Sequence, residues 1–359
     1  MRYIKTFFFV AILFFGFSPL AVGYANSGSE GLPAVFKRVA PATVVIKGYA
    51  RGGTANALRN LYPEGHPYRD LIPKESSADP QYQLASTGSG FIIHPDGYIV
   101  TNHHVIKDPV EKIEVTLYDT TELSAKIVGV DPDGDLAVLK VEYAQKLPSV
   151  KWGDSRKVEV GEPVFAIGSP FGLSVSLTAG IISAKNRELP NDLYTSYLQT
   201  DTSINLGNSG GPLFNMNGDV VGVNTAIYST SGGSIGIGFA IPQAEASLIA
   251  REIIAHGRVR RGWLGATIET ISQDALETLR IGQRGGVLIK AVEERGPAKE
   301  GGLQPFDVIV SINDRMVFSR DNFLRIFVRV FAGERITVVV VRSGEKKTLQ
   351  FTLRERPRN

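Results

Sequence analysis

A serine placed between glycines is the feature of this sequence that most suggests covalent catalysis. Ser209 lies in the run Gly207-Asn208-Ser209-Gly210-Gly211. A serine nucleophile must stand on a tight turn, with backbone N–H groups beside it that face the oxygen made negative during acyl transfer. Glycine before the serine permits the backbone that this turn needs, and glycines after it leave room for a substrate. Taken alone, the stretch is also compatible with a glycine-rich hairpin.

A base and a carboxylate occur in the order that such a serine requires. The hydroxyl needs an imidazole to accept its proton, and the imidazole needs a carboxylate to fix its tautomer. His104 follows a predicted strand, and Asp135 precedes another apolar run. The chain order His, Asp, Ser is that of chymotrypsin-type enzymes, whereas subtilisins begin with Asp and α/β-hydrolases with Ser. The sequence therefore predicts a triad of His104, Asp135 and Ser209.

Many short strands must position these residues. Apolar runs such as Thr43–Lys47, Gly90–Ile93 and Leu136–Val141 are separated by turn signals, for example at residues 94–97. Short strands without alternating helices favour β-barrels or sandwiches over a βαβ sheet. Residues 52–87 are polar and weakly patterned, so we expect a long inserted loop there.

A second folded unit is expected after this strand-rich part. Residues 243–256 have helical spacing, and Gly257 can end that helix. The basic segment 258–261 follows as a linker, and residues 262–353 read as a small α+β module. The length of 359 residues also favours two domains.

The N-terminus indicates export. Arg2 and Lys5 precede the apolar run Phe7–Phe17, and mostly small or apolar residues follow up to Ala25. This is the pattern of a secretory signal. Residues 1–25 are thus either a cleaved signal peptide or a retained N-terminal membrane anchor, and both alternatives place the protein body outside the cytoplasm.

Composition excludes several classes of site and partner. The chain has no cysteine, which rules out disulfides, a thiol nucleophile and cysteine-ligated zinc. A net charge of +3 gives no argument for nucleic acid. His66, His94 and His256 lack the spacing of metal ligands, so we expect neither a metal nor an organic cofactor.

Four motifs together resemble the HtrA (Deg) family of exported serine proteases. They are Thr-Asn-His-His-Val at 101–105, Asp-Leu-Ala-Val-Leu at 135–139, Gly-Asn-Ser-Gly-Gly-Pro-Leu at 207–213 and Gly-Ile-Gly-Phe-Ala-Ile-Pro at 236–242. The resemblance implies a mostly β chain. A chymotrypsin-like double β-barrel protease domain over residues 30–257 would be followed by one α+β PDZ domain over residues 258–357.

The resemblance also implies which neighbouring residues act. The histidine motif selects His104 over His103, and Asp-Leu-Ala selects Asp135 over Asp131 and Asp133.

The oxyanion hole would comprise the N–H groups of Gly207 and Ser209, with Asn208 between them. Leu206 replaces the proline that the family usually carries there, so we expect a softer turn.

Specificity is expected to follow from an uncharged pocket. By position in the fold, Ser203 would lie at the pocket base, and Ile204 and Ile227 would line its walls. This predicts cleavage after small or medium aliphatic residues. The strand expected to pair with the substrate backbone consists of Asn224, Thr225, Ala226 and Ile227.

The C-terminal module carries the expected peptide site. The loop that resembles the carboxylate-binding loop of HtrA PDZ domains consists of Trp263, Leu264, Gly265 and Ala266. Phe323 and Phe327 either flank the last peptide side chain or belong to the core. Phe306 stands where the family usually has glycine, so the resemblance does not predict the conformation of the following turn. Arg187 lies at the position of a family sensor arginine that relays PDZ occupancy, or is a solvated loop arginine.

By resemblance, the protein is an ATP-independent endopeptidase of protein quality control in the periplasm. Its partners would be unfolded or misfolded envelope proteins, C-terminal peptides at the PDZ domain and two further copies in a homotrimer. One alternative is a narrow regulatory protease that cleaves a single membrane signalling protein; a retained anchor would favour it. The other is a chaperone-like binding protein with an idle protease site, for which Leu206 is the only support.

Overall fold

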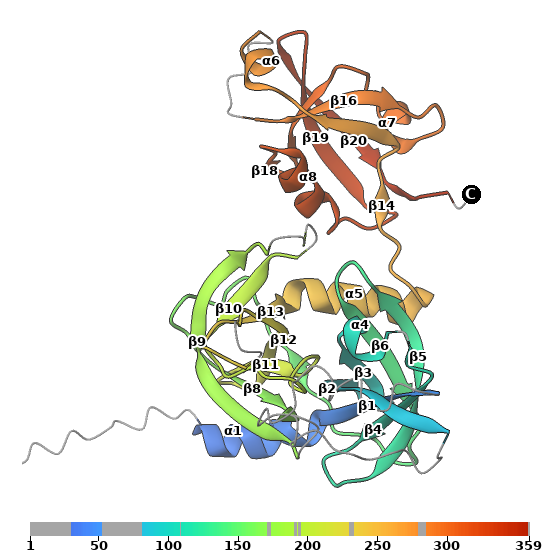
Figure 1. Cartoon of the computed structure of the whole chain (residues 1–359). Coiled ribbons are helices and arrows are strands. Elements are labelled where there is room, and N and C mark those ends of the chain that lie inside the picture. The colour runs from blue at the N-terminus through green and yellow to red at the C-terminus, as the bar shows by residue number, and fades with distance from the viewer. Residues whose placement is uncertain are drawn as a thin grey trace, which may run out of the picture.

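The protein is described here by a computed structural model of the 359-residue chain. The structure describes residues 30–51, 81–107, 109–170, 174–189, 192, 195–229, 233–278 and 285–357. Strands dominate these residues, as predicted. Figure 1 shows two barrels side by side below a smaller sheet domain, with one stretch of chain joining them.

The first barrel is closed by six antiparallel strands in the order β1-β2-β3-β6-β5-β4. Their bounds are β1 Thr43–Arg51, β2 Tyr82–His94, β3 Tyr98–Thr101, β4 Lys112–Thr116, β5 Glu122–Asp131 and β6 Leu136–Val141. Ile46, Ile99 and Leu139 are fully buried inside it. The turn between β2 and β3 requires Gly97, whose φ is 91° and where a Cβ would lie 2.4 Å from the carbonyl oxygen of Val141.

The inserted loop is shorter than we expected from the sequence. The loop was expected over residues 52–87, whereas residues 82–87 form the start of β2. They pair with the end of β1, for example Arg51 with Tyr82 and Gly48 with Ser86. Hydrogen bonds to a partner strand stabilise this polar segment, and a local pattern does not reveal such a partner.

The second barrel is built from a sheet in the order β11-β8-β9-β10-β13-β12-β7, closed by pairing of β11 with β12. Its strands are β7 Lys151–Trp152, β8 Pro163–Gly168, β9 Ser176–Arg187, β10 Tyr197–Thr200, β11 Pro212–Asn215, β12 Asp219–Ile227 and β13 Gly238–Pro242. Phe165 and Phe214 stack in its core, with ring centroids 5.2 Å apart. Helix α1, Leu32–Val39, buries Val35 and Val39 in the same cluster and continues into the 3₁₀ turn η1, Ala40–Ala42.

Helix α5, Gln243–His256, contacts strands of both barrels, including β5, β6, β12 and β13. Its apolar side, with Ile249 and Ile253, is buried against them. The helix ends as predicted at Gly257, whose φ is 69° and whose N–H donates to the carbonyl of Ile253. Helix α5 therefore packs across both barrels and holds them together.

The C-terminal unit is a small sheet domain with the predicted α+β character. Its elements are β14 Gly262–Trp263, β15 Ala266–Thr270, α6 Gln273–Thr278, β16 Val287–Val292, α7 Pro297–Glu300, β17 Val308–Ile312, β18 Arg315–Met316, α8 Arg320–Phe327, β19 Arg335–Arg342, β20 Glu345–Thr352 and β21 Arg354–Glu355. The main sheet has the order β15-β16-β17-β19-β20, so β15 is an edge strand, and α8 contacts it. An edge strand is a place where an extended peptide can add as a further strand.

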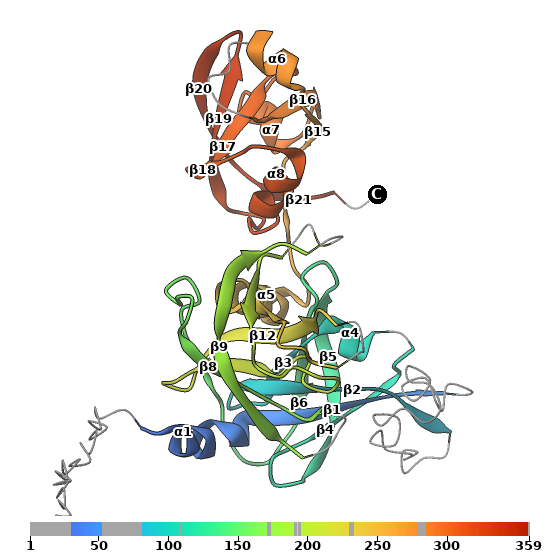
Figure 2. The same cartoon turned by 60° about the vertical axis from the view of Figure 1, so that its left-hand side comes forward.

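Arginines of the C-terminal unit contact the two barrels at several points. Figure 2 shows this unit above the barrels in a second view. Arg325 of α8 donates to the carbonyl oxygen of Asp192 at 2.7 Å and pairs with Glu188 at 3.2 Å. Arg261 pairs with Asp131 at 2.5 Å. The sheet domain is thus fixed to the barrels through charge pairs.

None of the helices in the described ranges combines the length and apolar character needed to cross a membrane. The expected signal or anchor, residues 1–25, lies outside the described residues.

Candidate active site

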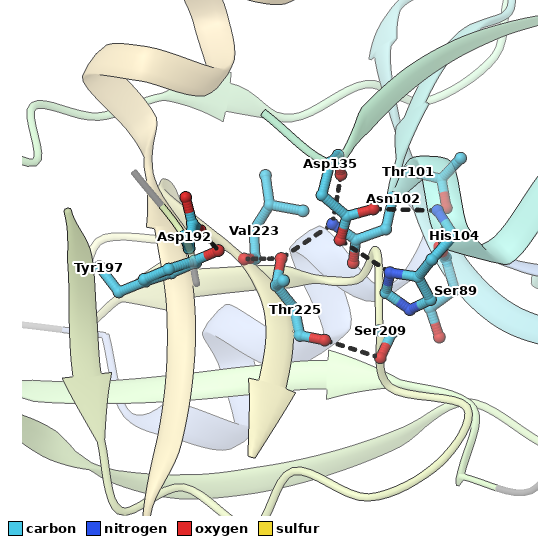
Figure 3. A network of polar contacts seen from close by, with 10 residues as sticks. All are labelled: Ser89, Thr101, Asn102, His104, Asp135, Asp192, Tyr197, Ser209, Val223 and Thr225. Atoms are coloured by element: carbon cyan, nitrogen blue, oxygen red, sulfur yellow. Dashed lines mark hydrogen bonds and ion pairs between the residues drawn. The ribbon is translucent and has the colours of Figure 1, made fainter. Parts of the chain in front are cut away.

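The three residues of the predicted triad come from different loops and meet between the barrels (Figure 3). His104 lies on the short helix α4, His103–Ile106, directly after β3. Asp135 ends the turn before β6, and Ser209 lies in the turn before β11. Because β3 pairs with β6, with Thr101 opposite Ala137, the histidine and the aspartate start from neighbouring strands.

Asp135 holds His104 through both carboxylate oxygens. Oδ2 of Asp135 lies 2.7 Å from Nδ1 of the imidazole, and Oδ1 accepts the backbone N–H of His104 at 2.9 Å. With the carboxylate ionised, Nδ1 carries the hydrogen and Nε2 is left as the basic nitrogen. Figure 3 shows the far edge of the ring turned toward Ser209. The arrangement is that of a base oriented by a carboxylate.

The alternative histidine, His103, and the alternative aspartates, Asp131 and Asp133, make other contacts. His103 contributes its backbone N–H to the carbonyl of Asp135 at 3.2 Å. Asp131 and Asp133 both face Arg261, at 2.5 and 3.6 Å. Burial raises the pKa of Asp131 despite this guanidinium.

Asp135 and Ser209 are also joined by a polar network. The amide of Asn102 donates to the carbonyl of Asp135 and to the hydroxyl of Thr225, both at 2.8 Å. The half-buried Ser209 hydroxyl donates to the carbonyl of Thr225 at 3.2 Å. The Ser209 hydroxyl thus rests on β12, across from the imidazole (Figure 3).

The turn around Ser209 depends on glycine. Gly207 and Gly210 have φ values of 101° and 84°, in the left-handed region. A Cβ on Gly210 would lie 2.3 Å from Oγ1 of Thr101 and from the carbonyl oxygen of Ser89. The turn is therefore pressed against the first barrel, beside the histidine strand.

Two N–H groups of this turn stay available for a ligand oxygen. The N–H of Asn208 donates to Asn205 at 3.0 Å, and that of Gly210 donates to Asn224 at 2.8 Å. Among the described residues, no group accepts from the N–H of Gly207 or of Ser209. These are the two donors expected for the oxyanion hole.

Leu206 is anchored by packing. It contacts a small apolar cluster with Tyr49, Tyr82 and Leu84, where β1 and β2 lead into the inserted loop. The expected softness of this turn stays a prediction.

The residues expected to set specificity lie around the same turn. Ser203 is exposed, and its carbonyl accepts from the side chain of Asn208 at 3.2 Å. Ile204 is 2% exposed and packs in the core of the second barrel, whereas Ile227 is half-buried. The residues expected to pair with substrate, Asn224, Thr225, Ala226 and Ile227, form the end of β12. Their roles remain predictions.

The expected peptide loop turns sharply between β14 and β15. Trp263 is half-buried in β14 and Leu264 is buried. Gly265 has a φ of 73°, and a Cβ there would lie 2.8 Å from the Cα of Gly296. Ala266 begins the edge strand β15.

Of the two phenylalanines on α8, Phe323 is a core residue, 2% exposed. The half-buried Phe327 stacks on it with centroids 5.3 Å apart. Phe306 is 78% exposed with a φ of 71°, so a bulky residue occupies the left-handed position where the family usually has glycine. Arg187 is exposed and donates to the side chain of Gln199 at 2.9 Å within the second barrel.

Three functional candidates were not singled out in the sequence: Arg325, Tyr197 and Ser89. Arg325 contacts Asp192, whose carboxylate accepts from the hydroxyl of Tyr197 at 2.5 Å. Burial and this carboxylate raise the pKa of Tyr197. The third is Ser89, buried against the nucleophile turn. It too stands between glycines, a signal that the sequence offers, whereas nothing local indicates the contact of Arg325.

No three His, Cys, Asp or Glu side chains of the described residues converge as metal ligands.

Comparisons with known proteins agree with this geometry. A model of the trypsin-like peptidase domain matches residues 88–223, and a model of the PDZ domain matches residues 262–353. A probable periplasmic serine endoprotease, DegP-like, of Pseudomonas putida is 46% identical over 285 residues, 79% of this chain and 59% of the relative. This chain thus spans less than two thirds of that relative's length. The relative of the same description from Hahella chejuensis is 41% identical over 348 residues, 94% of this chain and 73% of the relative.

A solved structure shows the same architecture. The HtrA-type protease AlgW with a tripeptide is 36% identical, with a TM-score of 0.69 over 90% of this chain and 97% of that one. The chain therefore belongs to the HtrA (DegP-like) family of serine proteases, with a trypsin-like peptidase domain followed by one PDZ domain.

Proposed function

We propose that the protein is an exported, ATP-independent serine endopeptidase of periplasmic protein quality control. The observation that carries the proposal is the double contact of Asp135 with His104, at 2.7 and 2.9 Å, beside a serine on a glycine turn. A carboxylate that fixes both the ring and the backbone of one histidine sets that histidine up as a base.

In this mechanism Ser209 Oγ attacks the scissile carbonyl carbon while Nε2 of His104 takes its proton. The carbonyl oxygen becomes negative and accepts from the N–H groups of Gly207 and Ser209. The tetrahedral intermediate collapses, the C–N bond breaks, and His104 returns the proton to the leaving amine. Water then hydrolyses the acyl-enzyme with the same base. Asp135 stays ionised and stabilises the imidazolium.

The substrates proposed are unfolded or misfolded envelope proteins, cut after small or medium aliphatic residues. The relatives named periplasmic endoproteases support this compartment. The proposed assembly is a homotrimer.

The PDZ domain is proposed to bind C-terminal peptides in the groove between β15 and α8 and to control cleavage. The contact of Arg325 with Glu188 and Asp192 supports this, because it links the groove helix to the protease barrels. The peptide in the AlgW structure is in line with peptide binding by this family.

A narrow regulatory protease that cleaves one membrane signalling protein is the second candidate. The observation that favours it is the link from α8 to the barrels through Arg325, because such a link can make cleavage depend on a bound peptide.

Degradation of casein by the purified protein, with and without C-terminal peptides, tests the proposal against Ser209→Ala. Degradation by the wild type and none by the variant supports the quality-control protease. Intact casein with every peptide, while a fluorophosphonate labels Ser209, supports the narrow protease. Absence of both labelling and cleavage contradicts the proposed function and leaves the chaperone-like alternative.

A further inference from the structure

Ser89 is a fully buried serine of the first barrel. Its hydroxyl, N–H and carbonyl form hydrogen bonds with the second barrel or with the strand that precedes His104. Its hydroxyl donates to the carbonyl of Gly207 at 2.6 Å and accepts the N–H of Ser169 at 2.8 Å. Its own N–H donates to the carbonyl of Ser209 at 2.8 Å. Its carbonyl accepts from the hydroxyl of Thr101, three residues before His104.

The direction of the hydroxyl hydrogen is determined by these partners. A serine hydroxyl has one hydrogen to donate. Since the N–H of Ser169 can only donate, the hydrogen of Ser89 is directed at the Gly207 carbonyl. A buried carbonyl that lost this partner would be unsatisfied, which is unfavourable.

These contacts determine how the peptide groups of the turn are oriented. The peptide after Gly207 is held at its carbonyl by Ser89 and at its N–H by Asn205. The peptide before Ser209 is held at its carbonyl by the N–H of Gly211. Gly207 has a φ of 101°, and without a Cβ its two neighbouring peptide groups can rotate readily. Fixing the carbonyl on one side of it limits the rotation of the N–H on the other.

We propose that Ser89 is a positioning residue of the oxyanion hole: its hydroxyl holds the Gly207 carbonyl so that the N–H groups of Gly207 and Ser209 face the substrate oxygen. This inference rests on the proposed serine-protease function. Beside Ser89, β2 contacts the nucleophile turn so closely that position 88 has no room for a side chain. A Cβ on Gly88 would lie 3.1 Å from the Ser209 carbonyl and 2.7 Å from the side chain of Val105.

The test compares wild type with Ser89→Ala, which removes the hydroxyl and keeps the backbone bond to Ser209. Loss of a whole oxyanion-hole donor lowers kcat by about 10²–10³. A donor that is displaced and not lost should lower kcat by a smaller factor. We therefore expect kcat on a peptide cleaved after valine to fall about tenfold to a hundredfold, with KM within about twofold. A peptide aldehyde should lose affinity by a similar factor, because its hemiacetal oxygen occupies the hole. The pH dependence of kcat should not move, since the contacts of His104 with Asp135 are untouched.

Ser155→Ala is the matched control. Ser155 is also a buried serine of the protease barrels, and its hydroxyl accepts the N–H of Ala244 at the start of α5. Its hydrogen bonds among the described residues go to the start of α5 and not to the nucleophile turn. Loss of its hydroxyl should therefore lower stability and leave kcat and aldehyde affinity unchanged. An equal fall of kcat in both variants would show a general structural effect and overturn the proposal.

Ser89→Cys replaces the hydroxyl by a slightly larger thiol, which is a weaker donor. It is the variant to measure where alanine lowers the yield of folded protein, and the chain has no other cysteine with which it could pair. A folded Ser89→Cys or Ser89→Ala enzyme with wild-type kcat, or with lowered kcat and unchanged aldehyde affinity, overturns the role of Ser89 alone. A wild type that neither cleaves the peptide nor binds the aldehyde overturns the proposed function and this inference with it.

Discussion

Glu245 lies at the contact between the protease barrels and the C-terminal domain, in the first turn of α5. It is 9% exposed, and Arg329 approaches its carboxylate at 3.3 Å. Burial raises the pKa of Glu245 to about 7, against the opposing effect of Arg329 and Arg261; the negative charges of Asp131 and Asp192 raise it further. The carboxyl is therefore largely protonated at pH 5 and ionised at pH 8.

The pH dependence of folding stability that Glu245 causes follows from the difference between its folded and unfolded pKa. The folded-state pKa of about 7 lies above the reference value of 4.5. The carboxyl thus contributes stability that is fully present below about pH 4.5 and is lost as the pH rises through about 7. One pKa unit corresponds to about 1.4 kcal/mol, so the whole contribution is about 3 kcal/mol. Between pH 5 and pH 8, about 2–3 kcal/mol of it is lost.

Glu245→Gln removes this titration and keeps the shape of the side chain. We expect its free energy of unfolding, relative to wild type, to rise by about 2–3 kcal/mol from pH 5 to pH 8.

Urea unfolding followed by tryptophan fluorescence measures this difference. The chain has two tryptophans, and Trp152 packs edge-on against Phe91 in the protease barrels. In a Trp263→Phe background the signal therefore reports the barrels that carry Glu245. A difference between variant and wild type that stays the same, within about 0.5 kcal/mol, at pH 5 and pH 8 would refute the buried, raised-pKa carboxyl.

Three further predictions concern the site and the C-terminal domain. Asp135→Asn should lower kcat by about 10⁴ with little change in KM, because an amide no longer selects the Nδ1–H tautomer of His104; steady-state kinetics checks this. Arg325→Ala removes the contacts with Glu188 and Asp192, so the ratio of peptide-stimulated to basal cleavage should fall toward one; an unchanged ratio contradicts PDZ control through α8. Phe306→Gly removes the backbone strain of a bulky residue with positive φ, and little buried area is lost because Phe306 is exposed. The free energy of unfolding of the C-terminal domain should therefore rise by about 0.5–1 kcal/mol, which calorimetry would show as a higher Tm.

The sequence predicted the parts of the site that local chemistry determines. A nucleophile turn needs glycine at positions of positive φ, and Gly207 and Gly210 have it. The choice of Asp135 rested on a short motif, and the structure places its carboxylate on His104.

Contacts between distant segments were not predictable in this way. Arg325 and the carbonyl of Asp192 are 133 residues apart, and neither neighbourhood carries a pattern that indicates the other. The early start of β2 likewise depends on its partner β1, across the inserted loop. Such pairings are set by tertiary packing, which overrides local propensity.

The central claim is that Ser209 is a nucleophile activated by His104 and Asp135. Its most direct test is to treat the wild type, Ser209→Ala and His104→Ala with a fluorophosphonate and to locate the adduct by peptide mass spectrometry. We predict one adduct on wild type, at Ser209, and none on either variant. An adduct at another serine, an unmodified wild type, or His104→Ala modified as fast as wild type would contradict the claim.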